Sequence, residues 1–214
     1  MPQRIKIYLA AGIVAPVMYF CFVLIGGFLR PDYIAFSHTI STLVEVDAPN
    51  RILLDTGFTL SNIFLILFGY GIFYLGRKET KKHKAFSGLA LIGAGIAGIL
   101  IIIFPKDPES VRMSTTGFIH HFFIAILAIF TIISTLYFES GENHNRNLRK
   151  YSKISLICIL VFAVITVIAG LSGYYYAGLF ERIAVGFYLQ WVMVTAMVTL
   201  KQILRSKFYP PPPK

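Results

Sequence analysis

The hydrophobic positions of this chain fall into six long runs that are separated by short polar segments. A helix needs about 20 mainly apolar residues to cross the hydrocarbon core of a membrane, and each run is long enough. The pattern therefore predicts an all-α polytopic membrane protein, a bundle of six transmembrane helices. The runs cover residues 7–29, 52–75, 85–104, 115–138, 151–173 and 183–204.

The segments between the runs are too short to hold a soluble domain, so we expect one bundle over residues 1–208. A proline-rich cytoplasmic tail over 209–214 is expected to be extended. In the first outer segment, His38, Ser41 and Glu45 recur at helical spacing among apolar residues. This spacing predicts a short amphipathic helix at the outer interface or folded over the mouth of the bundle.

The distribution of charge predicts an orientation. Six crossings place both termini on one side, which carries 15 of the 20 Lys and Arg residues and 3 of the 10 acidic residues. Because basic residues favour the cytoplasmic side, we expect a multi-pass plasma-membrane protein with both termini cytoplasmic. The net charge is +10, and most of the basic residues lie on one side of the spans. This distribution favours membrane lipids as partners over nucleic acid.

Glycines in the third run match the pattern G-x-G-x-x-G at residues 93–98. A dinucleotide site needs a preceding strand and an acidic residue about 20 positions further on, and the run offers neither. Small residues at these positions instead favour close approach of helices in lipid.

Ionisable residues in or beside membrane spans are costly, so their positions indicate candidate sites. In the predicted topology they gather at the outer ends of the spans, and five separate segments contribute one each at similar depth. These residues are His38, Asp55, Asp107, His120 and Arg182.

Two imidazoles and one or two carboxylates match the ligand set of a catalytic zinc site that keeps a position open for water. We therefore take His38, Asp107 and His120 as candidate zinc ligands. Asp55 is an alternative carboxylate ligand and a candidate catalytic residue. Arg182 would bind an anionic headgroup or oxyanion, and Ser41 would orient water.

The leading interpretation is a membrane protein with an outer-facing polar pocket that handles a lipid or other amphiphile, with metal-dependent hydrolysis as the candidate reaction. Whether it is an enzyme, and its oligomeric state, stay open. His120 and His121 are adjacent, about 100° apart on a helix, and the sequence leaves open which of them faces the bundle.

Other interpretations remain. In a structural network, Arg182 would pair with Asp107 or Asp55, His120 would bond a backbone carbonyl, and His38 would be solvated. In a binding or transport protein, the stripe of Asp55, Thr59 and Asn62 would begin a polar path; no broken span or inverted repeat supports transport. A scaffold or sensor subunit fits every feature.

Three blocks of residues resemble a family of prokaryotic membrane proteins known as domain of unknown function 998. The first block is the segment His38-Thr39-Ile40-Ser41-Thr42-Leu43, followed by Ala48-Pro49-Asn50 and Asp55-x-Gly57-Phe58. The second is Phe104-Pro105-x-Asp107 with Gly117-x-x-His120, and the third is Gly178-Leu179-x-x-Arg182 with Trp191 beyond.

The resemblance covers essentially the whole chain and implies a six-span bundle, but no activity. Members of the family usually have an acidic residue where this chain has Thr42, although Glu45 follows one turn later.

Overall fold

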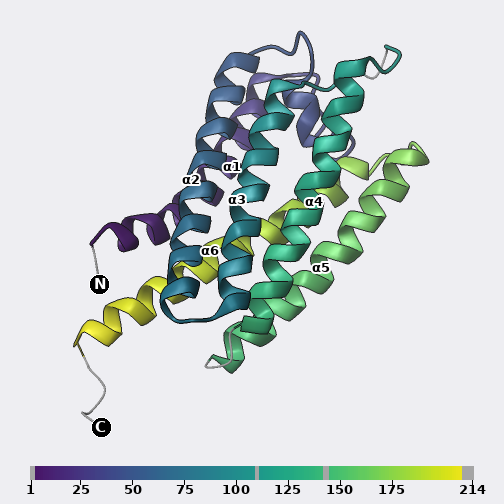
Figure 1. Cartoon of the computed structure of the whole chain (residues 1–214). Coiled ribbons are helices and arrows are strands. Elements are labelled where there is room, and N and C mark those ends of the chain that lie inside the picture. The colour runs from purple at the N-terminus through teal and green to yellow at the C-terminus, as the bar shows by residue number, and fades with distance from the viewer. Residues whose placement is uncertain (1–2, 109–110, 142–144, 209–214) are drawn as a thin grey trace.

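The computed structural model describes residues 3–108, 111–141 and 145–208, and this part of the chain is helical apart from its connections. Six helices in it are long and apolar enough to cross a membrane, which confirms the predicted fold class (Figure 1). They are α1 (Gln3–Leu29), α2 (Arg51–Lys78), α3 (Lys82–Ile103), α4 (Thr115–Gly141), α5 (Arg146–Leu171) and α6 (Ala177–Phe208). The proline-rich tail at 209–214 lies outside the described residues.

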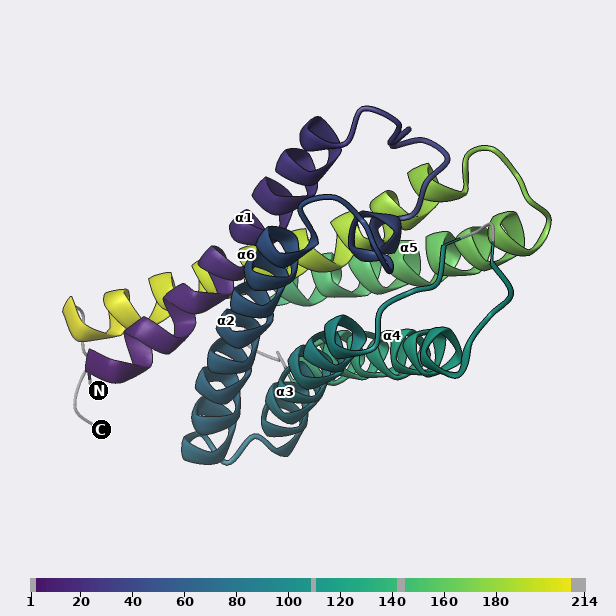
Figure 2. The same ribbon diagram turned by 90° about the horizontal axis from the view of Figure 1, so that it is seen from above.

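The helices form a ring in which each packs against its neighbours in sequence, and α6 closes the ring against α1. The first residues of α1 and the last residues of α6 lie on the same side of the molecule in both ribbon views (Figures 1 and 2). We call the end formed by residues 30–50, 104–108 and 172–176 the first-loop end. The opposite end, where residues 79–81 join α2 to α3, is the hairpin end.

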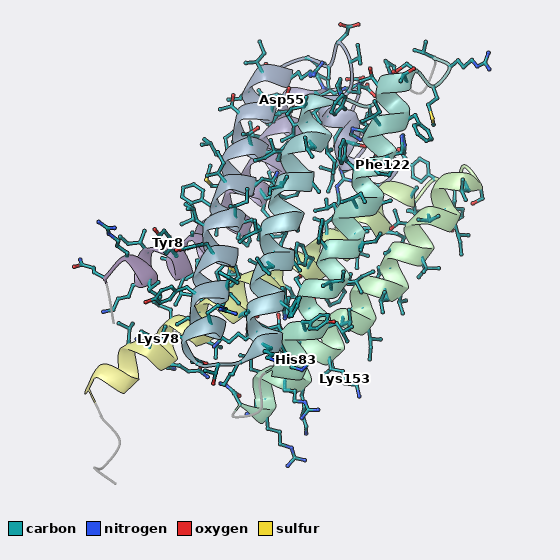
Figure 3. All side chains as sticks on the ribbon, in the orientation of Figure 1. Tyr8, Asp55, Lys78, His83, Phe122 and Lys153 are labelled. Carbon is teal, nitrogen blue, oxygen red and sulfur yellow. The ribbon has the colours of Figure 1, made fainter. Side chains whose placement is uncertain are left out.

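Three labelled residues locate the two ends. Asp55 marks the first-loop end, whereas Lys78 and Lys153 mark the hairpin end (Figure 3). The assignment of the hairpin end to the cytoplasm stays a prediction from the charge distribution.

Small residues allow α2 and α3 to pack closely. A Cβ atom on Gly69 would lie 2.9 Å from the carbonyl oxygen of Gly88, and one on Gly88 would collide with the backbone nitrogen of Phe73. The glycines at positions 93–98 lie inside α3, where their amides belong to a continuous helix and cannot cradle a phosphate. They serve helix packing instead.

Two apolar cores stabilise the bundle. The larger core lies between the helices around Phe68, Leu91 and Trp191, whose side chains are fully buried. The indole nitrogen of Trp191 donates a hydrogen bond of 3.0 Å to the Ser152 hydroxyl, so this buried donor is satisfied. The smaller core lies beneath the first loop, around Leu43, Leu54 and Phe58.

The helix in the first loop is shorter than the sequence indicates. It is a single 3₁₀ segment, η1 (Ile40–Val44), and it contacts α1, α2 and α6. Ile40, Leu43 and Val44 are buried in the smaller core. Of the two predicted placements, the structure therefore has the one that folds over the mouth of the bundle. His38 precedes η1 and Glu45 follows it, so they share no helical face with Ser41.

Candidate functional site

The first loop is sealed onto the first turns of α6 by backbone groups. The Leu179 amide donates a hydrogen bond of 2.9 Å to the Phe36 carbonyl oxygen. The Ile40 amide donates one of 2.6 Å to the Glu181 carboxylate, across a separation of 141 residues. The amides at the start of a helix have no partner within that helix, so the loop carbonyl satisfies one of them. We call this seam between residues 33–40 and the start of α6 the loop clamp.

Arg182 completes the loop clamp. One of its terminal nitrogens donates to the carbonyl oxygens of His38 and Gly178, each at 2.8 Å, and the other donates to the Tyr33 hydroxyl. The structural alternative that paired Arg182 with Asp107 or Asp55 is not what the structure shows, because Arg182 bonds to carbonyls and a phenol. The arginine therefore ties the loop to α6.

Tyr33 supports the same arrangement. Its hydroxyl donates a hydrogen bond of 3.0 Å to the Thr39 carbonyl oxygen, and the Arg182 guanidinium lies 5.3 Å from the centre of its ring. Burial raises the pKa of Tyr33 to about 12, although the Arg182 charge opposes this shift. The phenol is therefore neutral at physiological pH and able to donate.

Gly178 permits the close approach of the loop to α6. A Cβ atom on this residue would collide with the His38 carbonyl oxygen and would lie 3.0 Å from that of Ala35. Backbone atoms cannot rotate away as a flexible side chain could, so glycine is required here.

Ser41 belongs to a chain of hydroxyl groups beside the loop clamp. Its hydroxyl lies 3.0 Å from the Thr39 hydroxyl, which is also 3.0 Å from that of Thr42. The Lys106 ammonium group donates to the Thr42 hydroxyl at 3.1 Å. The arrangement connects the segment after α3 to the first loop, and the backbone hydrogen bond of 2.9 Å from Val46 to the Lys106 carbonyl reinforces the connection.

A largely buried ion pair anchors the end of α1 to the end of η1. The Arg30 guanidinium lies 2.9 Å from the Glu45 carboxylate and also donates to the Thr42 carbonyl oxygen at 2.5 Å. Burial tends to lower the pKa of Arg30, but the Glu45 carboxylate outweighs it and raises this pKa. Arg30 therefore keeps its positive charge beside the Glu45 carboxylate.

His120, not His121, faces the bundle. Its side chain is fully buried, and its Nδ1 lies 2.8 Å from the Phe104 carbonyl oxygen at the end of α3. Since a carbonyl only accepts, Nδ1 carries the proton. A hydrogen bond from His120 to a backbone carbonyl is what the interpretation as a structural network predicted. Nε2 has no hydrogen-bond partner in the described part of the chain. His121 is exposed and bonds to the Gly117 carbonyl oxygen on its own helix at 2.8 Å.

The two candidate aspartates have local partners. Asp107 accepts hydrogen bonds from the backbone amide of Ser114 at 2.7 Å and from the Ser114 hydroxyl at 2.8 Å, just before α4 begins. Asp55 pairs with Arg51, one turn earlier on α2, at 3.1 Å. The Asp107 carboxylate thus stabilises the start of α4.

His38, Asp107 and His120 do not form a metal-binding cluster. Within residues 3–108, 111–141 and 145–208, no group of three or more His, Cys, Asp or Glu side chains could hold a metal ion. His38 Nδ1 instead accepts a hydrogen bond of 3.0 Å from the Ile34 amide. Zinc binding stays a prediction from the sequence.

A groove of about 620 Å³ lies beside the loop clamp, between α1, the first loop and α6. We call it the lateral groove. Apolar and aromatic side chains form nearly all of its wall, and Arg182 is the one charged residue among its described lining. Its wall includes Tyr19, Val23, Leu24, Phe28 and Val185.

A family model described as "Protein of unknown function (DUF998)" matches residues 13–198, which is most of the chain. The chain belongs to the DUF998 family. No curated protein and no solved structure matches it.

The DUF998 blocks noted in the sequence meet in space as two pairs. His38 to Leu43 meets Gly178, Leu179 and Arg182 in the loop clamp. Phe104 and Asp107 meet Gly117 and His120 at the junction of α3 and α4, where a Cβ atom on Gly117 would collide with the Asp107 carboxylate. In this DUF998 protein, the residues of each pair thus form a structural junction at the first-loop end.

Sequence reasoning missed the roles of Tyr33, Glu181 and Lys106 in this DUF998 protein. Their partners are mostly backbone groups or hydroxyls of the first loop, which leave no spacing signature. An available signal was the pair Glu181 and Arg182 at the start of an apolar span, because charges there require partners.

The pKa of Asp107 predicts a local response of the DUF998 fold to acid. Hydrogen bonds from the Ser114 amide and hydroxyl lower this pKa. A depressed carboxyl pKa contributes stability that is present above the unfolded value and is lost as pH falls through the folded value, below about pH 4. We expect the protection of the first turn of α4 against hydrogen exchange, relative to the intrinsic rate at each pH, to fall in this range.

The matched variant is Asp107→Asn, which should show fast exchange at the start of α4 at neutral pH and lose the acid dependence. Asp32→Asn is the control, because this exposed carboxylate contacts Arg30 at the end of α1 rather than Ser114. Unchanged acid dependence in Asp107→Asn would contradict the assignment.

Proposed function

We propose that this membrane protein binds a lipid or other amphiphile in the lateral groove. The hydrocarbon chain would lie along α1 and α6, and the polar head would lie at Arg182. The observation that carries the proposal is an apolar groove of about 620 Å³ with one charged residue in its described wall. Ligand sites are typically apolar cavities of about 300–1,000 Å³ with a few polar groups that fix orientation.

The groove is accessible from the surface that would face the membrane. Leu24 and Phe28 line it, and 73% and 89% of their surfaces are exposed. Exposed apolar residues on a transmembrane helix contact lipid chains. An acyl chain could therefore enter sideways without leaving the hydrocarbon phase, which supports an amphiphile over a water-soluble ligand.

Arg182 has the capacity to bind a headgroup. The loop clamp engages three of its N–H donors, and a guanidinium has further donors for an anionic or carbonyl oxygen. Because the clamp already fixes its position, binding would cost little side-chain entropy.

The geometry supports binding more directly than hydrolysis. Ser41 and Asp55 are engaged with Thr39 and Arg51, and neither lines the lateral groove. We therefore assign them no step in the proposed function, and metal-dependent hydrolysis stays a hypothesis from the sequence.

Photolabelling with a diazirine analogue of palmitic acid tests the proposal. In detergent, we expect crosslinks on α1 and α6 at the groove. Gly27 lines the groove, and the nearest atom to an added Cβ is 3.6 Å away on Tyr33, so Gly27→Leu should fill space without a backbone clash. We expect labelling to fall about tenfold, the equivalent of losing contact with about two methylene groups.

The matched control is Gly170→Leu, because Gly170 lies on α5 with no atom within 4 Å of an added Cβ. Its labelling should equal that of the unchanged protein. Equal labelling of both variants at the groove would contradict the proposal. Hydrolysis of an amphiphilic ester, with zinc in the purified protein and loss of both in His120→Ala, would favour the enzyme hypothesis instead.

A further inference from the structure

A second groove lies at the hairpin end, at the opposite end of the molecule from Asp55 and the first loop. Its volume is about 420 Å³, and it is formed by the end of α2 and the start of α3. Gly76 and Ala85 form its floor, where the backbones of the two helices are so close that a Cβ atom on Gly76 would collide with Ala85. We call it the hairpin groove.

The charges around the hairpin groove are unbalanced. Glu79 pairs with Lys81 at 3.1 Å and with Lys84 at 3.4 Å. Partial burial disfavours its ionised form, but the two lysines outweigh burial and lower the pKa of Glu79. This single carboxylate is therefore ionised and already shared between two cations.

Arg77 and Lys82 line the hairpin groove and are exposed. Among the residues that the structure describes, neither has a carboxylate within 4.0 Å. A groove with two cations and no anion among its described lining residues is complementary to a negatively charged group.

The wall beneath these cations is apolar. Phe73, Phe86 and Leu89 line it, and the side chains of Phe86 and Leu89 are exposed. Leu89 follows Lys82 by seven residues, so the apolar wall extends about 10 Å along α3. A water-soluble anion would leave this wall uncovered, whereas a phospholipid would cover it with an acyl chain.

We propose that the hairpin groove binds an anionic phospholipid, with its phosphate between Arg77 and Lys82 and an acyl chain along Phe86 and Leu89. This site is separate from the lateral groove and does not depend on its function. Basic clusters beside membrane spans attract anionic headgroups, and each nearby cation contributes to the affinity.

Native mass spectrometry of the full-length protein with added phosphatidylglycerol tests the proposal. We expect the double variant R77Q/K82Q to bind this lipid about 25-fold more weakly, since each lost cation should cost about fivefold. Binding of zwitterionic phosphatidylcholine should not change. The conservative variant R77K/K82R should retain most of the affinity because it keeps both charges.

The matched control is K78Q/K153Q, which removes two cations from the same end but from outside the groove (Figure 3). It should bind phosphatidylglycerol nearly as the unchanged protein does. An equal loss in both double variants would show a nonspecific effect of net charge and would overturn the proposal.

A second experiment distinguishes binding of a lipid from binding of a soluble anion. Leu89→Trp should obstruct the acyl chain without changing the charge, and we expect weaker binding of phosphatidylglycerol. Glycerol 3-phosphate at millimolar concentration should not displace the lipid. Complete displacement, or full binding by Leu89→Trp, would overturn the acyl-chain assignment.

Discussion

Replacing Gly178 with alanine is expected to lower the free energy of unfolding by about 3 kcal/mol, at the upper end of typical overpacking costs. The added methyl group would collide with the His38 carbonyl oxygen. That oxygen also accepts a hydrogen bond from Arg182, so the first loop must move away from α6 to relieve the collision. The measurement is reversible unfolding in mixed micelles of mild detergent and dodecyl sulfate, followed by circular dichroism.

Gly186→Ala provides the matched control on the same helix. No atom lies within 4 Å of an added Cβ at Gly186, and alanine favours a helix over glycine by up to about 1 kcal/mol. This variant should therefore be neutral or slightly more stable. If both variants had the same stability, the close approach at Gly178 would not be a constraint on the fold.

Replacing Glu45 with alanine is expected to cost a similar amount, about 3 kcal/mol, because it leaves a buried charge without its partner. Arg30 and Glu45 are both largely buried, and their side-chain atoms are 2.9 Å apart. Removing both charges in R30M/E45M should cost less than removing Glu45 alone, since replacement of a buried ion pair by apolar residues is often tolerated. The same unfolding measurement applies.

Asp32→Ala tests whether burial, rather than charge alone, sets the size of this effect. Asp32 contacts the same arginine at 3.4 Å, but its side chain is 72% exposed. Exposed ion pairs contribute at most about 1 kcal/mol, so we expect a small change. A loss in Asp32→Ala as large as that in Glu45→Ala would refute the role assigned to burial.

The bundle was predictable because a membrane demands about 20 consecutive apolar residues for each crossing, and this requirement is visible in any single span. The start of α6 was harder to predict from the sequence. The apolar run begins at Ile183, whereas the helix begins at Ala177. Glu181 and Arg182 precede this run inside the helix, and the first loop satisfies both of them. A partner so distant in sequence leaves no local pattern.

The candidate site was predictable in part. His38 and Arg182, two of the candidate residues from the sequence, lie together at the first-loop end, where Arg182 donates to the His38 carbonyl oxygen. The chemical roles assigned to them stay predictions. Their contacts could not be foreseen, because a side chain that bonds to a backbone carbonyl needs no particular residue type at that carbonyl. The lateral groove was equally hidden, since it exists only where α1 and α6, the first and last helices, come together.

The separation between Ile40 and Glu181 bears on how the protein matures. These residues form one hydrogen bond but lie 141 positions apart. At about 5–20 residues per second, a ribosome needs roughly 7 to 28 s to make the intervening chain. During this interval the Ile40 amide lacks its native acceptor, and the first loop is not yet held against α6. Chains truncated before the last span would lack Glu181, so this hydrogen bond between the first loop and α6 could never form in them.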